Sequence, residues 1–126
     1  MNKLNNKHCL PCEGGVAALD RETIKQNLKE LGNEWQVSED YKKIVKDFRF
    51  KNYYQTMAFV NALAWMAHRE NHHPDLEVGF NHCRVQYTTH AAKGLTENDF
   101  ICAQQVERLN EPLQQVCSIG DERKQK

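Results

Sequence analysis

The feature that most constrains the fold is the stretch 53–71, which contains neither glycine nor proline. Its apolar residues, among them Leu63 and Trp65, cover a wide arc of a helical wheel, so a helix here would be buried on most sides. Asn52 is a good N-cap residue for this helix. Pro74 would end it, because the residue before a proline is pushed out of the helical region. We therefore expect one long central helix against which the rest of the chain packs.

Alternating apolar and polar residues on either side of this helix predict two β-hairpins. In the first hairpin Lys46 interrupts the apolar side, so one face of that strand is expected to be only half buried. In the second hairpin the alternation runs through Phe80, and the next two residues, Asn81 and His82, have the character of a turn. The expected strands are 34–38, 42–50, 76–80 and 83–88.

Two further helices are expected outside the hairpins. Asp20 as N-cap and Gly32 as the residue after the last turn bound a short helix over about 21–31. Thr96 is the N-cap of a helix near the C-terminus, which Pro112 is expected to break or bend near its end.

The resulting order α-β-β-α-β-β-α predicts an α+β fold, with one four-stranded antiparallel sheet and three helices packed on one face. A chain of 126 residues favours a single domain. We place it at 19–118, after an extended lead-in at 1–18 and before a charged, mobile tail at 119–126. The sheet would have open edges, through which a dimer could form.

The charge balance excludes several classes of function. Lys and Arg number 17, as do Asp and Glu, so the chain lacks the basic excess of a protein that binds nucleic acid or an anionic membrane. No apolar run approaches the roughly 20 residues of a transmembrane helix. The first residues lack the apolar core of a signal peptide, so we expect a cytoplasmic protein.

The five cysteines are expected to be reduced thiols, because their number is odd and no export signal precedes them. Cys9 and Cys12 form a C-x-x-C pair beside His8, which supplies half of a usual zinc site. A metal or redox role there is the alternative to a locally packed segment. The other three are expected to act as small apolar residues: Cys83, Cys102 and Cys117.

Histidines gather where the predicted elements meet. His72 and His73 precede Pro74 at the end of the central helix, and His90 follows the last strand. If the second hairpin closes as expected, His90 returns to His73 and the imidazoles converge at one end of the sheet. Histidine can donate and accept a proton near neutrality. With no glycine-rich phosphate loop and no serine in a nucleophile elbow, proton transfer is the chemistry that suits this cluster.

Other interpretations remain open at this point. Each histidine could be a surface residue, and Asp99 at N3 of its helix is explained by capping alone. His68 and His72, four residues apart on the central helix, could bind zinc with a third imidazole. However, Arg69 stands where the metalloprotease motif requires glutamate, so we expect no metal.

The spacing of these residues resembles the signature of the pterin-4a-carbinolamine dehydratases. The segments 46–50 and 94–99 are also similar to that family, and the resemblance covers about 20–115. The matching positions are His68, His72, His73, Pro74, Phe80, His90 and Asp99.

The resemblance implies an enzyme that removes water from 4a-hydroxytetrahydropterin, the product of aromatic amino-acid hydroxylases, to give quinonoid dihydropterin. It implies no metal or organic cofactor, and a homodimer or homotetramer with a functional link to a hydroxylase. By resemblance the catalytic set is His72, His73 and His90, and the acid and the base among them are not distinguished. The positions expected to bind or orient the substrate are Asp99, Pro74, Phe80 and His68, with Phe80 or Trp65 as an aromatic wall.

The alternative is a non-enzymatic, dimerising binding module, or a transcriptional coactivator such as one animal member of the family. It would use the sheet and the long helix to engage a partner, and its function would not depend on the histidines.

Overall fold

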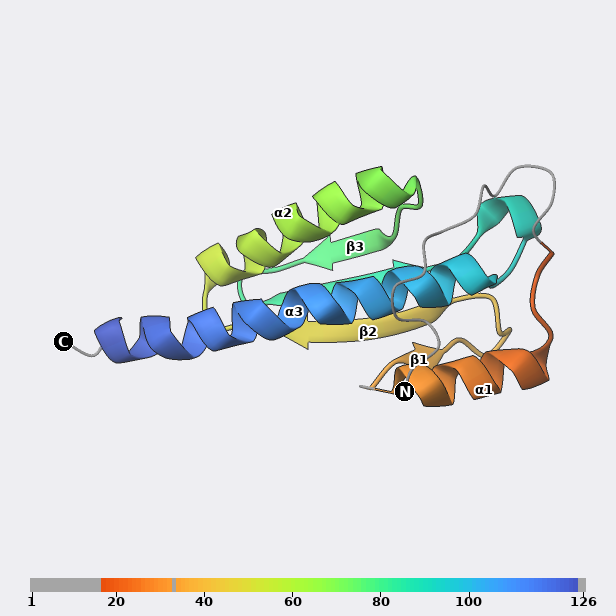
Figure 1. The fold of residues 1–126 in the computed structure, drawn as a ribbon, viewed down its shortest axis with the longest axis horizontal. Helices are drawn as coiled ribbons and strands as arrows, with labels where there is room; N and C mark the ends of the chain where they lie inside the picture. The colour runs from red at the N-terminus through yellow and green to blue at the C-terminus, as the bar shows by residue number, and fades with distance from the viewer. Residues whose placement is uncertain (1–16, 33, 125–126) are drawn as a thin grey trace.

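The computed structural model describes residues 17–32 and 34–124, with side chains up to residue 111 (Figure 1). The fold class predicted from the sequence is confirmed: three α-helices accompany a four-stranded antiparallel sheet. None of the helices in the described part of the chain is long and apolar enough to cross a membrane. The elements are α1 (Arg21–Leu31), β1 (Gln36–Val37), β2 (Ile44–Arg49), α2 (Tyr53–Glu70), β3 (Asp75–Val78), β4 (His82–Tyr87), the 3-10 helix η1 (His90–Ala92) and α3 (Glu97–Lys124).

The strands lie in the order β1-β2-β4-β3, so the two hairpins join through β2 and β4 in the middle of the sheet. Helix α3 runs along the sheet and contacts both α2 and α1, as Figure 1 shows. The core lies between these helices and one face of the sheet. Its largest fully buried side chains include Tyr87, Phe59 and Phe100.

Helix α1 has the bounds that its capping residues predict. The Asp20 carboxylate accepts a hydrogen bond from the Thr23 amide at 2.8 Å, which satisfies a donor of the first turn. Gly32 ends the helix with φ 57°, a left-handed value that costs glycine little. Helix α2 begins in the same way, because the Asn52 side chain accepts from the Gln55 amide at 2.9 Å.

Helix α2 ends at Glu70, close to the expected bound, but by a different mechanism. Asn71 adopts the left-handed conformation (φ 54°, ψ 41°), and its amide bonds back to the His68 carbonyl at 3.2 Å. The His72 amide bonds to the Ala67 carbonyl at 3.1 Å. These two bonds form a Schellman motif. The prediction that Pro74 ends the helix is therefore wrong: Asn71 turns the chain three residues before the proline.

The second hairpin turns one residue earlier than expected. The Gly79 amide bonds to the His82 carbonyl at 2.9 Å, so Phe80 and Asn81 form the turn and His82 begins β4. A side chain at position 79 would collide with the His82 ring, since a Cβ there would lie 2.1 Å from Cε1. The glycine therefore leaves room for the His82 ring, and Phe80 belongs to the turn rather than to a strand.

The face of β2 that was expected to be half buried is instead covered by α3, through a buried ion pair. The Lys46 ammonium lies 2.6 Å from a Glu107 carboxylate oxygen, and the Trp35 indole donates to the same oxygen at 2.8 Å. The ammonium also lies 4.5 Å from the centre of the Phe48 ring. Glu107 is on α3, so the pair ties the helix to the sheet, which the alternation within β2 could not reveal.

The C-terminal end of the chain differs from expectation. Helix α3 continues through Pro112 to Lys124, so the break expected at the proline is absent from this described helix. A proline removes one helical hydrogen bond and adds a local clash, and a helix whose first half is firmly packed can accommodate it. The lead-in at 1–16, with Cys9 and Cys12, lies outside the described residues.

Candidate active site

The most distinctive polar contact links the end of α2 to the start of α3. His72 Nε2 lies 2.6 Å from Asp99 Oδ1, and both side chains are buried. His72 follows the Schellman motif of α2, and Asp99 is in the first turn of α3. The structure thus brings together two of the predicted residues that are 27 positions apart in sequence.

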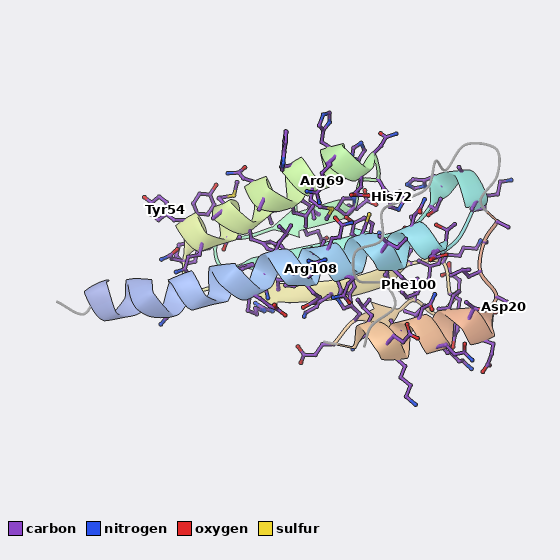
Figure 2. The ribbon with its side chains drawn as sticks, viewed as in Figure 1. Asp20, Tyr54, Arg69, His72, Phe100 and Arg108 are labelled. Carbon is purple, nitrogen blue, oxygen red and sulfur yellow. The ribbon has the colours of Figure 1, made fainter. Side chains whose placement is uncertain are left out.

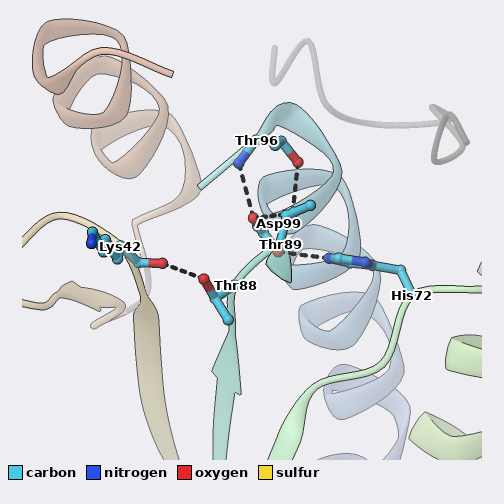
Figure 3. A network of polar contacts seen from close by, with 6 residues as sticks. All are labelled: Lys42, His72, Thr88, Thr89, Thr96 and Asp99. Carbon is cyan, nitrogen blue, oxygen red and sulfur yellow. Dashed lines mark hydrogen bonds and ion pairs between the residues drawn. The ribbon is translucent and has the colours of Figure 1, made fainter. Parts of the chain in front are cut away.

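Asp99 is held from its other side by two threonines (Figure 3). Its Oδ2 accepts from the Thr89 hydroxyl at 2.7 Å and from the Thr96 amide at 2.9 Å. The Thr89 hydroxyl donates its hydrogen to Asp99. It therefore accepts from the Thr96 hydroxyl, whose oxygen lies 2.9 Å away. The Thr89 hydroxyl and the Thr96 amide both donate to this carboxylate, and a carboxylate only accepts, so the histidine tautomer that fits the short contact carries its proton on Nε2. The network fixes the tautomer and the direction of the imidazole.

Packing restrains the same ring from one side. His72 is 7% exposed, and its ring stacks on Tyr87 with 5.5 Å between centroids and 17° between planes. Tyr87 is the last residue of β4 and is fully buried. The imidazole therefore rests on a strand while it bonds to a helix.

The other two predicted histidines flank this network and are exposed. His73 is the next residue after His72, and His90 follows Thr89 directly and begins η1. The register of the hairpin, with Asp75 opposite Gln86, returns the chain after β4 to the chain before β3, as predicted. Two solvent-accessible imidazoles thus lie next in sequence to the two residues that hold Asp99.

The remaining predicted positions lie in three different places. Pro74 follows His73 and leads into β3. His68 lies on the exposed side of α2, where its ring centre is 6.1 Å from that of Trp65. Phe80 lies at the opposite end of the hairpin from His72, because its carbonyl accepts from Thr56 Oγ1 in the first turns of α2. Figure 2 shows this length of α2, with Tyr54 at one end and His72 beyond the other. Within one chain, Phe80 is not brought to the histidines.

The metal alternative meets a geometric obstacle. His68 and His72 were placed on one helix face, but His72 lies beyond the end of α2, buried, while His68 is exposed. Among the residues with described side chains, no group of three or more His, Cys, Asp or Glu has an arrangement that could hold a metal ion.

Two residues of the network have roles that the sequence pattern did not indicate. Thr89 stands directly before His90 in the sequence, and Tyr87 falls within the expected strand 83–88. Their contacts with Asp99 and His72 depend on how β4 meets α3 and the end of α2, which no local spacing encodes. The only signal of this role in the sequence is that Thr89, a polar residue, follows the strand with alternating apolar and polar residues.

The sequence model of one protein family, described as pterin 4 alpha carbinolamine dehydratase, matches residues 17–109. A relative from Legionella pneumophila (strain Corby), named as a pterin-4-alpha-carbinolamine dehydratase, is 58% identical over 106 residues, which are 84% of this chain and 94% of the relative. A similarly named protein from Nitrosomonas europaea is 57% identical over 106 residues, covering 84% and 92% of the two chains.

Solved structures show the same fold. A transcriptional coactivator/pterin dehydratase from Brucella melitensis superposes with a TM-score of 0.70 at 26% identity, covering 73% of this chain and 97% of that one. A pterin dehydratase-like protein, identified as a RuBisCO assembly factor in the alpha-carboxysome, superposes with a TM-score of 0.56 at 26% identity, covering 64% and 94%. The family match, the sequence relatives and the fold agree, and the chain belongs to the pterin-4-alpha-carbinolamine dehydratase family.

Proposed function

We propose that this protein is a hydro-lyase that converts 4a-hydroxytetrahydropterin to quinonoid dihydropterin by histidine acid–base catalysis. The observation that supports it most strongly is the buried network in which His72 and Thr89 bond to Asp99, because an exposed imidazole, His73 or His90, directly follows each of these two residues in sequence. Family membership supplies the substrate class, since the relatives are named for this reaction.

The reaction needs two proton movements, which the exposed imidazoles can carry out. An imidazolium donates a proton to the 4a-hydroxyl, so that the C–O bond breaks and water leaves. A neutral imidazole takes the proton from the neighbouring ring nitrogen, N5, whose electrons form the new C=N bond. We assign these roles to His73 and His90, and each is expected to contribute roughly a hundred- to ten-thousand-fold to the rate.

His72 completes the catalytic set in a different environment. With Nε2–H bound to Asp99 and its face on Tyr87, the ring is oriented before substrate arrives. A ring that need not reorganise during the reaction stabilises the transition state more than a mobile ring does. Asp99 is thus a positioning residue. Pro74 restricts the backbone of His73, because the residue preceding a proline is held in extended conformations.

A direct assay tests the proposal. Purified protein is added to freshly generated pterin carbinolamine, and the loss of the carbinolamine is followed against buffer alone. We expect clear acceleration, most of which is lost in the His73→Ala/His90→Ala double variant. His82→Ala is the matched control, since His82 lies at the far end of the hairpin. A wild-type rate equal to buffer would refute the proposal, and an unchanged rate in the double variant would move the site elsewhere.

A non-enzymatic role is the second candidate, favoured by two observations. A structural neighbour with this fold is described as a RuBisCO assembly factor. Helix α2 also exposes aromatic side chains that could contact a partner, with Tyr54 82% and Trp65 68% exposed. This function would survive the double histidine substitution and would fail when the exposed aromatic residues are changed. We further propose a cytoplasmic homo-oligomer that acts after an aromatic amino-acid hydroxylase.

A further inference from the structure

Lys93 has a backbone conformation that lysine rarely adopts. It ends the 3-10 turn η1 with φ 58° and ψ 36°, in the left-handed region. In this region the Cβ of an L-residue crowds the following carbonyl oxygen, so glycine or asparagine is the usual choice. Glycine stands at the next position, where a Cβ would lie 3.3 Å from the Cβ of Ala18. The turn thus carries a charged side chain at a position whose backbone favours glycine.

The closure of the loop that carries His90 requires this conformation. Thr89 and Gly94 exchange two backbone hydrogen bonds, 3.1 Å from the Thr89 amide and 3.3 Å from the Gly94 amide. The chain must therefore turn back on itself between these two residues. The Lys93 amide closes the turn by bonding to the His90 carbonyl at 3.1 Å. This bond also sets the backbone of Lys93 beside that of an imidazole proposed to be catalytic.

The strain at Lys93 points to a function for its side chain. Strained backbone conformations cluster at sites where a ligand binds or a reaction takes place. Lys93 is exposed, so burial of its side chain does not compensate for the strain. What lysine adds to the turn is an ammonium group on a flexible four-carbon stem. Because its backbone adjoins that of His90, this stem can reach the space in front of the His90 ring.

The reaction determines which part of the pterin lies near this ammonium. The hydroxyl leaves from C4a and the proton leaves from N5, and N5 is bonded to C6. The side chain by which pterins differ is attached to C6, so it leaves the ring next to the two reacting groups. An imidazole of His90 that serves either group therefore has the C6 side chain as a neighbour, and Lys93 has the same neighbour.

The charges near Lys93 suit an anionic ligand. The exposed imidazoles of His73 and His90 are each protonated in part of the molecules near neutral pH. Asp75 pairs in register with a partly exposed residue of β4, so its side chain lies on the face of the sheet turned away from the helices. Glu97 is in the first turn of α3, where the helix dipole stabilises its carboxylate. A phosphate beside Lys93 would thus have one full and two partial positive charges as neighbours.

We propose that Lys93 determines the substrate class of this enzyme, because its ammonium binds a phosphate on the C6 side chain of the pterin. The proposal rests on the proposed dehydratase function and adds the part of the substrate that the dehydration itself does not specify. Lysine binds phosphate as a point charge, without a fixed geometry, which suits a flexible side chain. Glycine at position 93 would relieve the strain and lose this contact.

Two substitutions at position 93 separate strain from binding. Lys93→Gly removes both the strain and the charge. Its Tm is expected to rise by roughly 2–5 °C. Its KM for the carbinolamine of a phosphorylated pterin is expected to rise roughly threefold to tenfold, with little change in kcat. Lys93→Arg keeps the charge, so its KM is expected to stay near the wild-type value. Lys51→Ala is the matched control, an exposed lysine just before α2, at the end of that helix away from His72.

A pair of substrates identifies the group that Lys93 binds. Each variant is assayed with two carbinolamines that differ only in the phosphate on the C6 side chain. The wild type and the Lys51→Ala control are expected to have the lower KM for the phosphorylated pterin. Lys93→Gly is expected to have the same KM for both pterins. The preference of the wild type should shrink at high salt, because the charges are exposed.

The outcomes separate this proposal from the dehydratase function. Equal KM values of the wild type for the two pterins, a preference that survives Lys93→Gly, or a preference lost in Lys93→Arg would each overturn the role of Lys93 and leave the dehydratase function intact. A Tm of Lys93→Gly below that of the wild type would also overturn it, because the side chain would then support the fold. A wild-type protein inactive on both pterins would overturn the dehydratase function, and the role of Lys93 with it.

Discussion

Replacing Asp99 separates the structural from the catalytic role of the buried network. Asp99 is fully buried and accepts hydrogen bonds from His72, Thr89 and Thr96. In Asp99→Asn the amide oxygen can still accept the two bonds at the Oδ2 position. The amide nitrogen then faces His72 Nε2, so the imidazole must change tautomer to accept from it.

The expected losses follow from these bonds. A bond to a charged group, worth ~1.5–3 kcal/mol, becomes a neutral one of ~0.5–1.5 kcal/mol, so Asp99→Asn should lower the free energy of unfolding by about 1–2 kcal/mol. Asp99→Ala leaves three buried donors without an acceptor, at ~1–3 kcal/mol each, for a loss on the order of 3–9 kcal/mol. The asparagine variant should therefore fold well but carry the wrong histidine tautomer.

Urea unfolding and steady-state kinetics together test this reasoning. We expect Asp99→Asn to lower kcat by about 100-fold or more while KM changes less, because orientation of a catalytic imidazole is lost and the pterin surface is not. Nitrogen-15 NMR of His72 should show the change of tautomer. If Asp99→Asn is as active as the wild type, or as unstable as Asp99→Ala, the assigned role of Asp99 is wrong.

Two further predictions concern stability. Glu107→Ala should lower the free energy of unfolding by about 3–5 kcal/mol, because it leaves the Lys46 ammonium buried without its counter-ion, and Lys46→Met in the same chain should recover much of the loss in urea titrations. Hydrogen bonds from Thr23 hold the pKa of the Asp20 carboxyl below its ordinary value of 3.8. The contribution of this carboxylate to the stability of the folded protein is therefore present above that pH and is lost as the pH falls through the lowered pKa. Asp20→Asn, which keeps a cap but does not titrate, should flatten the acid end of the stability curve, and a curve as steep as that of the wild type would contradict this role.

The layout of the fold could be predicted because its signals are local. Alternation identified the strands, and Asp20, Asn52 and Gly32 set helix ends through contacts within one turn. The errors arose where a more distant or less obvious contact decides. Asn71 ends α2 through a left-handed conformation that the sequence only permits, and the bond from the Gly79 amide to the His82 carbonyl sets the turn of the second hairpin one residue earlier than expected.

The candidate site could be predicted as a set of residues but not as an arrangement. The junction positions of His73 and His90, together with the return of the hairpin, predicted that their imidazoles would lie at one end of the sheet. The pairing of His72 with Asp99, and the part played by Thr89, depend on where the first turn of α3 docks against the sheet. Lys46 shows the same limit, since its partner Glu107 is 61 positions away.

One amide reports on whether the site is assembled. The Thr96 N–H is bonded to the same carboxylate that holds His72, so fraying of the first turn of α3 would release this amide and the imidazole together. Its hydrogen-exchange rate therefore measures how often the site opens in the native protein. A pterin analogue that binds only the assembled site should slow exchange at Thr96 in proportion to its occupancy, even though it does not contact that amide.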